Sequence, residues 1–199
     1  MSGEEAAAHR NPWRRLRSRI AYENAWISVR HDDVIRPDGE PGIYGVVQFR
    51  NVAVGVVALD EAERVLLVGQ YRYTLDAYSW EIPEGGVPPN EAPLDGARRE
   101  LAEETGFEAA EWHELVRLAT SNSVTDEVGV LYVARGLTPG TPRPDGTEEL
   151  AVRWVTLAEA IAMIDAGEMT DAMSQVGILR VASPGRWAPS GPRLPQGRR

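Results

Sequence analysis

Three glutamates have the spacing of a metal-binding helix face: Glu100, Glu103 and Glu104. They lie in GGVPPNEAPLDGARRELAEETGF, residues 85–107, at positions i, i+3 and i+4. On a helix this spacing puts all three carboxylates on one side, where their mutual repulsion destabilises the helix unless a cation binds them. Ligands that are all oxygen suit hard ions, so the segment predicts a site for Mg²⁺ or Mn²⁺ beside a phosphate-bearing substrate.

The neighbouring residues are of the types that would hold these ligands in place. Arg99 lies four positions before Glu103, and Glu91 lies near the start of the helix, so we expect Glu91 to orient Arg99 and Arg99 to brace Glu103. Gly85 and Gly86 precede the helix, and without a side chain there the backbone can approach an ion or a phosphate closely.

This pattern resembles the Nudix box, and every fixed position of that signature is matched from Gly85 to Phe107. The resemblance extends over about residues 20–180 to the ADP-ribose pyrophosphatase branch and its nucleoside-diphosphate-sugar relatives. It is carried by VLLVGQYRY, SWEIPEGG, the box, a loop ending in Asp126-Glu127, and DAGEMTDAMSQVGILRV. The resemblance implies an α+β protein with the Nudix fold, an α/β/α sandwich around a mixed sheet, with a small N-terminal β domain.

The resemblance also implies roles for individual residues. The expected ligands of Mg²⁺, or of Mn²⁺ in its place, are Glu100, Glu103, Glu104 and the backbone carbonyl of Glu84. Glu103, Glu104 and Arg99 are expected to be catalytic.

Four further positions are expected to contact the substrate: Arg72, Glu81, Asp126 and Glu127. Several ADP-ribose enzymes carry a proline in the loop after the box, in a stretch that precedes the Asp-Glu pair. This chain has Asn122 at that place, and the difference favours hexose-type nucleotide sugars.

An acidic residue that takes a proton from the attacking water is expected in the loop PRPDGTEELAVRW. Glu148 aligns best with that position, while Glu149, Asp145 and a glutamate of the box are the alternatives.

The predicted reaction is Mg²⁺-dependent hydrolysis of the pyrophosphate in a nucleoside diphosphate sugar, giving a nucleoside monophosphate and a sugar phosphate. ADP-ribose, GDP-mannose and UDP- or ADP-hexoses are the candidate substrates. One alternative is a Nudix pyrophosphatase for nucleoside triphosphates, dinucleoside polyphosphates or coenzymes. A second is a catalytically silent Nudix domain that binds a nucleotide.

The elements that must position these residues follow from periodicity and turn residues. A helix is expected over about 91–105, with Asn90 as its N-cap, Gly106 as its C-terminal stop, and a buried face that includes Leu101. Strands are expected in 25–35, 42–50, 52–60, 65–73, 78–82, 113–119, 128–134 and 151–155, and further helices in 157–166 and 171–181.

Four segments are expected along the chain: a flexible N-terminus over 1–12, an N-terminal β domain over 13–50, a hydrolase domain over 51–182, and a flexible tail over 183–199. In the relatives that the chain resembles, such an N-terminal β domain commonly reaches the partner's site in a dimer. A homodimer is therefore expected here.

Composition excludes several classes of protein. The net charge is −9, which argues against a nucleic-acid partner. All 21 basic residues are arginine, a residue suited to bidentate contacts with phosphate. There is no cysteine, so disulfides and thiol catalysis are excluded, and a reducing compartment is compatible with the chain. No apolar run approaches the roughly 20 residues of a membrane helix, and the first residues lack a signal-peptide core, so a soluble cytoplasmic protein without a membrane partner is expected.

Overall fold

The computed structural model describes residues 10–143 and 149–183, which form two compact units. One unit is the chain up to Arg50 together with Ser121–Asp126. The other consists of Asn51–Thr120 and the residues from Glu127 onward.

The first unit is a three-stranded antiparallel sheet in the order β1 (Arg14–Glu23), β2 (Ile27–Ile35) and β3 (Pro41–Phe49). Strand β1 was not expected from its arginine-rich sequence, which lacks an apolar alternation, and all ten of its residues are exposed. At the centre of the sheet Asp32 is buried, and it accepts hydrogen bonds from Ser18 Oγ at 2.5 Å and Arg30 Nε at 3.0 Å. These contacts supply the pairing that a buried charge requires.

The segment Ser121–Asp126 lies along β3. Val47 forms a parallel bridge with Thr125, and the Tyr44 hydroxyl donates to the carbonyl of Ser123 at 2.7 Å. The carboxylate of Asp126 accepts the backbone N–H of Phe49 at 3.0 Å, so it satisfies a donor at the very end of the strand.

The second unit contains two sheets. One is antiparallel, in the order β10 (Ala151–Thr156), β5 (Arg64–Arg72) and β6 (Ala77–Glu81). The other has the order β7 (Glu84–Val87), β4 (Val52–Ala58), β9 (Val128–Pro139) and β8 (Phe107–Ala119). Because β4 and β9 are parallel while their other neighbours are antiparallel, this sheet is mixed, as predicted.

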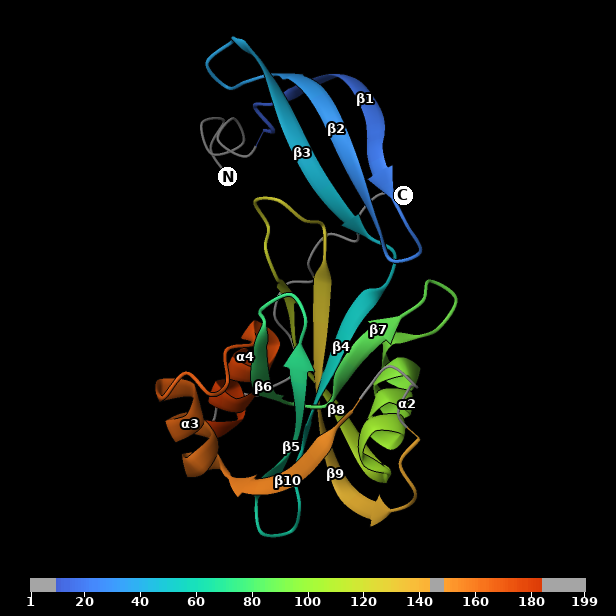
Figure 1. The fold of residues 1–199 in the computed structure, drawn as a ribbon, viewed down its shortest axis with the longest axis vertical. Helices are drawn as coiled ribbons and strands as arrows, with labels where there is room; N and C mark the ends of the chain where they lie inside the picture. The colour runs from blue at the N-terminus through green and yellow to red at the C-terminus, as the bar shows by residue number, and fades with distance from the viewer. Residues whose placement is uncertain (1–9, 144–148, 184–199) are drawn as a thin grey trace, which may run out of the picture. The chain divides into compact units, whose positions relative to one another are not determined.

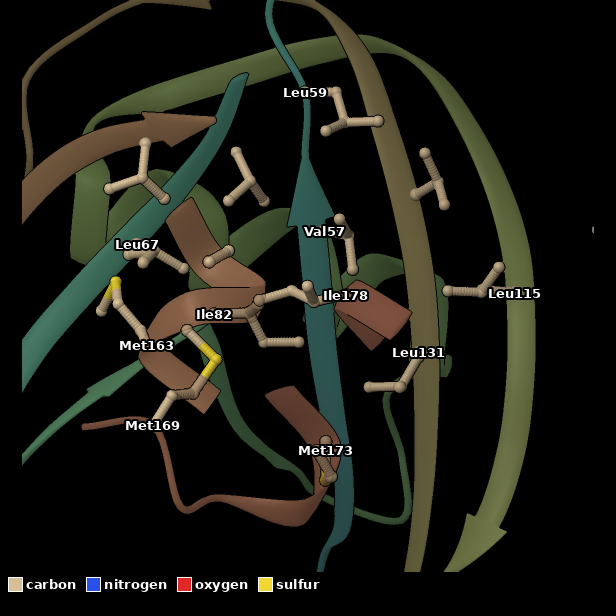
Figure 2. Close-up of a cluster of buried hydrophobic side chains, with 14 residues drawn as sticks. Val57, Leu59, Leu67, Ile82, Leu115, Leu131, Met163, Met169, Met173 and Ile178 are labelled. Atoms are coloured by element: carbon tan, nitrogen blue, oxygen red, sulfur yellow. The ribbon is translucent and has the colours of Figure 1, made fainter. Parts of the chain in front are cut away.

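Three helices flank these strands on opposite sides: α2 (Pro93–Thr105) on one, α3 (Leu157–Asp165) and α4 (Ala172–Ala182) on the other (Figure 1). Successive residues of β4 point to opposite faces, which creates two apolar clusters. Val57 packs with Ile178 and other side chains of α3 and α4 (Figure 2), whereas Val56 packs with Leu101 of α2. The strands therefore form the middle layer of an α/β/α sandwich.

Helix α2 begins later than expected. Ala92, rather than Asn90, is the N-cap residue, and Pro93 starts the helix, where its missing N–H costs nothing. At the other end Gly106 adopts a left-handed conformation with φ 75°, which confirms it as the C-terminal stop. None of the helices in the described parts of the chain is long and apolar enough to cross a membrane.

Candidate active site

The packing of α2 fixes the direction of the three glutamates. Leu101 is completely buried, and a Cβ on Gly96 would overlap Val87 of β7, so the helix lies very close to that strand. Glu104 follows Leu101 by three positions and is therefore carried onto the packed side, where only 3% of it is exposed. Its Oε2 accepts the backbone N–H of Glu84 at 3.1 Å.

Gly85 lets a second carboxylate reach the same stretch of backbone. A Cβ added to Gly85 would overlap the carboxylate of Glu100, so any other residue here would displace that side chain. Glu104 thus meets the main chain of Glu84, and Glu100 meets that of Gly85.

Arg99 connects the remaining acidic residues. Its Nε and Nη2 donate to the two carboxylate oxygens of Glu91 at 3.2 and 3.0 Å, and its Nη1 donates to Glu100 at 2.7 Å and Glu103 at 3.0 Å. Nη2 also donates to the carbonyl of Gly86. The hydrogen bond to Glu91 is the main cause that raises the pKa of Arg99, and the same bond lowers the pKa of Glu91. The structure therefore brings together the pair that was expected to orient the ligands.

A second cluster of charges surrounds Arg72. Its Nε lies 2.9 Å from each carboxylate oxygen of the buried Glu81, and its Nη2 lies 2.8 Å from Glu84 Oε1. Burial acts to lower the pKa of Arg72, but the hydrogen bond and charge of Glu81 outweigh it and raise this pKa. Both residues were expected to contact substrate, and here they bind one another.

The side chain of Glu84 was not singled out from the sequence. Burial raises the pKa of its carboxyl well above the usual range, and the charges of Asp171 and Glu81 raise it further. Its Oε2 is buried and has no hydrogen-bond partner among the described residues. No local pattern indicates this environment, because Asp171 is 87 positions away and reaches the cluster through the fold.

The donors at this site fit a divalent cation. The available ligands are carboxylate oxygens and main-chain carbonyl groups, and Gly85 has no side chain that would keep a carboxylate away from the main chain. Oxygen ligands of this kind are the ones that Mg²⁺ prefers. Within residues 10–143 and 149–183, no three acidic or histidine side chains are arranged to hold a metal as they stand. Arg99 instead bonds to Glu100 and Glu103, so a cation would compete with its guanidinium for these oxygens.

Two further residues that were expected to contact substrate, Asp126 and Glu127, accept hydrogen bonds within the protein. Asp126 bonds to the end of β3, and Glu127 accepts a hydrogen bond of 2.5 Å from the hydroxyl of Thr120. Glu149 is exposed. Glu148 and Asp145, the other candidates for the general base, lie outside the described residues.

Comparison with known families gives two matches. Residues 49–174 match the NUDIX domain, and residues 13–47 match the nucleoside diphosphate sugar hydrolase N-terminal domain. The second match covers most of the three-stranded sheet.

Relatives of known activity cover most of the chain. An ADP-ribose pyrophosphatase of Mycobacterium tuberculosis is 33% identical over 83% of this chain and 81% of its own length. A CMP-5'-(N-acetyl-N-hydroxy-3-aminopropyl)phosphonate hydrolase of Streptomyces rubellomurinus is 28% identical over 85% of this chain and 82% of its own. Among solved structures, an ADP compounds hydrolase superposes with a TM-score of 0.77 at 22% identity, covering 85% of this chain and 92% of its own, which confirms the fold.

Proposed function

This chain belongs to the Nudix hydrolase family, and we propose that it cleaves the pyrophosphate of a nucleoside diphosphate sugar into a nucleoside monophosphate and a sugar phosphate. The observation that carries the proposal is the meeting of the Glu100 and Glu104 carboxylates with the backbone of Glu84 and Gly85. Such a set of oxygen donors is suited to a pyrophosphate accompanied by its cation.

Nudix hydrolases generally use divalent metal ions, and we propose Mg²⁺, with Mn²⁺ able to replace it. Glu100, Glu103, Glu104 and the Glu84 carbonyl would hold the ion. Bound there, it would neutralise phosphate charge and lower the pKa of a coordinated water.

The other residues of the site have separate tasks in this proposal. Arg99 orients the carboxylates and, held by Glu91, keeps a positive charge beside the phosphates. Arg72 presents the remaining donors of its guanidinium to the leaving phosphate, while Glu81 fixes its direction. Glu148 is proposed to accept the proton of the attacking water, with Glu149, Asp145 and a glutamate of the box as alternatives.

The class of substrate is supported by the relatives and by the N-terminal match. Two of the relatives are named for nucleotides joined to another group through phosphorus, ADP-ribose in one and a CMP phosphonate in the other. The match to the nucleoside diphosphate sugar hydrolase N-terminal domain points to the same class. We also propose a homodimer as the assembly, which the resemblance of the N-terminal β domain implies, and Asp126 and Glu127 as further substrate contacts. The proposed location is the cytoplasm.

A substrate panel tests the proposal. The purified protein is incubated with ADP-ribose, GDP-mannose, UDP- and ADP-glucose, a CMP-linked phosphonate, a dinucleoside polyphosphate and nucleoside triphosphates, each with Mg²⁺ and with EDTA. Products are identified by chromatography and mass spectrometry. The Glu104→Gln variant, purified in the same way, controls for contaminating phosphatases.

Release of a monophosphate and a sugar phosphate that needs Mg²⁺ and Glu104 is the expected result, and the order of rates then identifies the sugar. Cleavage restricted to triphosphates or polyphosphates would contradict the proposal and support the alternative substrates. Nucleotide binding without any cleavage would contradict it as well.

A further inference from the structure

Ser174, in the first turn of α4, is completely buried, and its hydroxyl oxygen accepts the backbone N–H of Ile82 at 3.0 Å. The two residues are 92 positions apart in the chain. Ile82 belongs to neither β6 nor β7, so its N–H has no ladder partner from the regular strands and depends on this hydroxyl.

The segment that follows Ile82 leads directly to the proposed cation site. The carbonyl of Pro83 accepts the N–H of Val56 at 2.8 Å, and the N–H of Glu84 donates to Glu104. Three consecutive residues are therefore held by three elements: Ile82 by α4, Pro83 by β4, and Glu84 by α2 and by its pairing with Gly55 of β4. Removing the contact with α4 leaves the start of this short segment less constrained, and the carbonyl of its last residue is an expected ligand.

Side-chain packing makes the contact with α4 rigid. Ile82 lies in the same apolar cluster as Met173 and Ile178 of α4 (Figure 2). A Cβ on Gly55 would come within 2.9 Å of Ile82 and 3.1 Å of Met173, so the helix and the segment are packed against β4 without spare room.

The first turn of α4 is itself fixed by Asp171. Its carboxylate accepts the N–H of Ser174 at 2.6 Å as the N-cap of the helix. Asp171 also acts electrostatically on Arg72 and Glu84, so this turn lies beside the charged cluster that surrounds Arg72.

From these contacts we infer that Ser174 is a positioning residue for the proposed cation site, acting through the Ile82–Glu84 backbone, with Asp171 fixing the turn that carries it. The inference rests on the proposed function, because it takes the Glu84 carbonyl as a ligand. It assigns α4, on the opposite side of the strands from α2, a part in setting the geometry of the site.

The test compares Ser174→Ala with Thr156→Ala. Thr156 is also a hydroxyl that accepts a backbone N–H, at the start of α3, so its removal gives a matched loss of one such contact away from the site. Mn²⁺ affinity is measured on the metal-free proteins by electron paramagnetic resonance, alongside Tm, and kcat and KM are measured with the substrate that the panel identifies.

Ser174→Ala is expected to bind Mn²⁺ about 10–100-fold more weakly than the wild type, the usual loss when a residue that orients a ligand is removed. At limiting Mg²⁺, kcat should fall by a similar factor, while KM for the nucleotide changes little. Thr156→Ala should lower Tm only. If Ser174→Ala does not fold, Asp171→Ala, which loosens the same turn, is expected to show a weaker effect in the same direction.

Mn²⁺ affinity equal to that of the wild type in the folded variant would overturn the inference and leave Ser174 a structural residue. That result leaves the proposed function intact, because the wild type still binds Mn²⁺ and turns over. A wild-type protein that neither binds Mn²⁺ nor cleaves any nucleotide of the panel would overturn both.

Discussion

Arg72 Nε lies 2.9 Å from both carboxylate oxygens of Glu81, a side chain that is only 3% exposed. The same guanidinium also binds Glu84, so one positive charge compensates two buried carboxyl groups. A buried ion pair of this kind contributes little net stability, but the loss of one partner leaves the other charged and unpaired.

Arg72→Ala should therefore reduce the free energy of unfolding by about 3 kcal/mol, since it leaves Glu81 without its partner. Urea unfolding at neutral pH measures the loss. The double variant Arg72→Ala/Glu81→Ala is the control, and it should recover part of the stability. A single variant as stable as the wild type would mean that this guanidinium is free to bind substrate rather than needed to neutralise Glu81.

Glu104→Gln should lower turnover by at least about a hundredfold, because a neutral amide oxygen attracts Mg²⁺ less strongly than a carboxylate does. The fold should persist, since the amide oxygen can still accept the N–H of Glu84. Steady-state kinetics and circular dichroism measure the two quantities. Turnover close to that of the wild type in a folded variant would remove Glu104 from the ligand set.

Gly85→Ala should abolish most Mg²⁺-dependent activity, because the new methyl group would occupy the place of the Glu100 carboxylate. Gly86→Ala is the matched control, since its methyl group would meet the amide end of Asn51, which can turn aside. Isothermal titration with Mn²⁺ compares the two variants. Equal Mn²⁺ affinity in both would show that Glu100 does not need its present position.

Asp126→Ala should free the end of β3. The N–H of Phe49 loses its acceptor, so its hydrogen exchange should accelerate by about fivefold, corresponding to about 1 kcal/mol of local stability. Hydrogen exchange is measured by NMR at Phe49 and at a central residue of the sheet, and the central residue serves as the control within the same protein. If KM rises while exchange is unchanged, Asp126 contacts substrate instead.

The buried carboxylate of Asp32 should make the stability of the protein depend on pH. Burial acts to raise its pKa, but hydrogen bonds from Ser18 and Arg30 hold the pKa below the ordinary 3.8. Because the folded pKa is the lower one, the stabilisation is present above pH 3.8 and is lost as the pH falls through the folded value.

Asp32→Asn should accordingly reduce stability by about 1–3 kcal/mol at pH 7, and this difference from the wild type should narrow below about pH 4. Asp38→Asn, at an exposed position in the same unit, should show little difference at any pH. A difference in stability between Asp32→Asn and the wild type that is the same at pH 7 and at pH 3 would show that the charge of Asp32 contributes nothing to stability.

The geometry around the expected ligands could be predicted where it is local in sequence. The spacing of Glu100, Glu103 and Glu104, the apolar positions around Leu101 and the stop at Gly106 all belong to one helix, where short-range geometry decides. The predicted N-cap, Asn90, was wrong because Pro93, whose φ is fixed near the helical value, starts the helix three residues later.

Long-range contacts could not be predicted. Strand β1 carries arginines where a strand usually alternates, and it is defined by its pairing with β2. The contacts of Ser174 with Ile82 and of Asp126 with Phe49 span 92 and 77 positions, and neither member of either pair has a local pattern that indicates its partner. The role of Arg72 as a partner of buried carboxylates depends on burial, which appears only in three dimensions.

Strand β4 lies between two apolar clusters, with Val56 facing α2 and Val57 facing α3 and α4. Because β4 contributes side chains to both clusters, unfolding of one cluster would also expose the β4 side chains that belong to the other. The stabilities of the two clusters are therefore coupled. The unit should therefore unfold in one cooperative transition. A cation that binds at α2 would then slow exchange of the amides in α3 and α4, where no ligand is expected, by the same free energy that it adds to the whole.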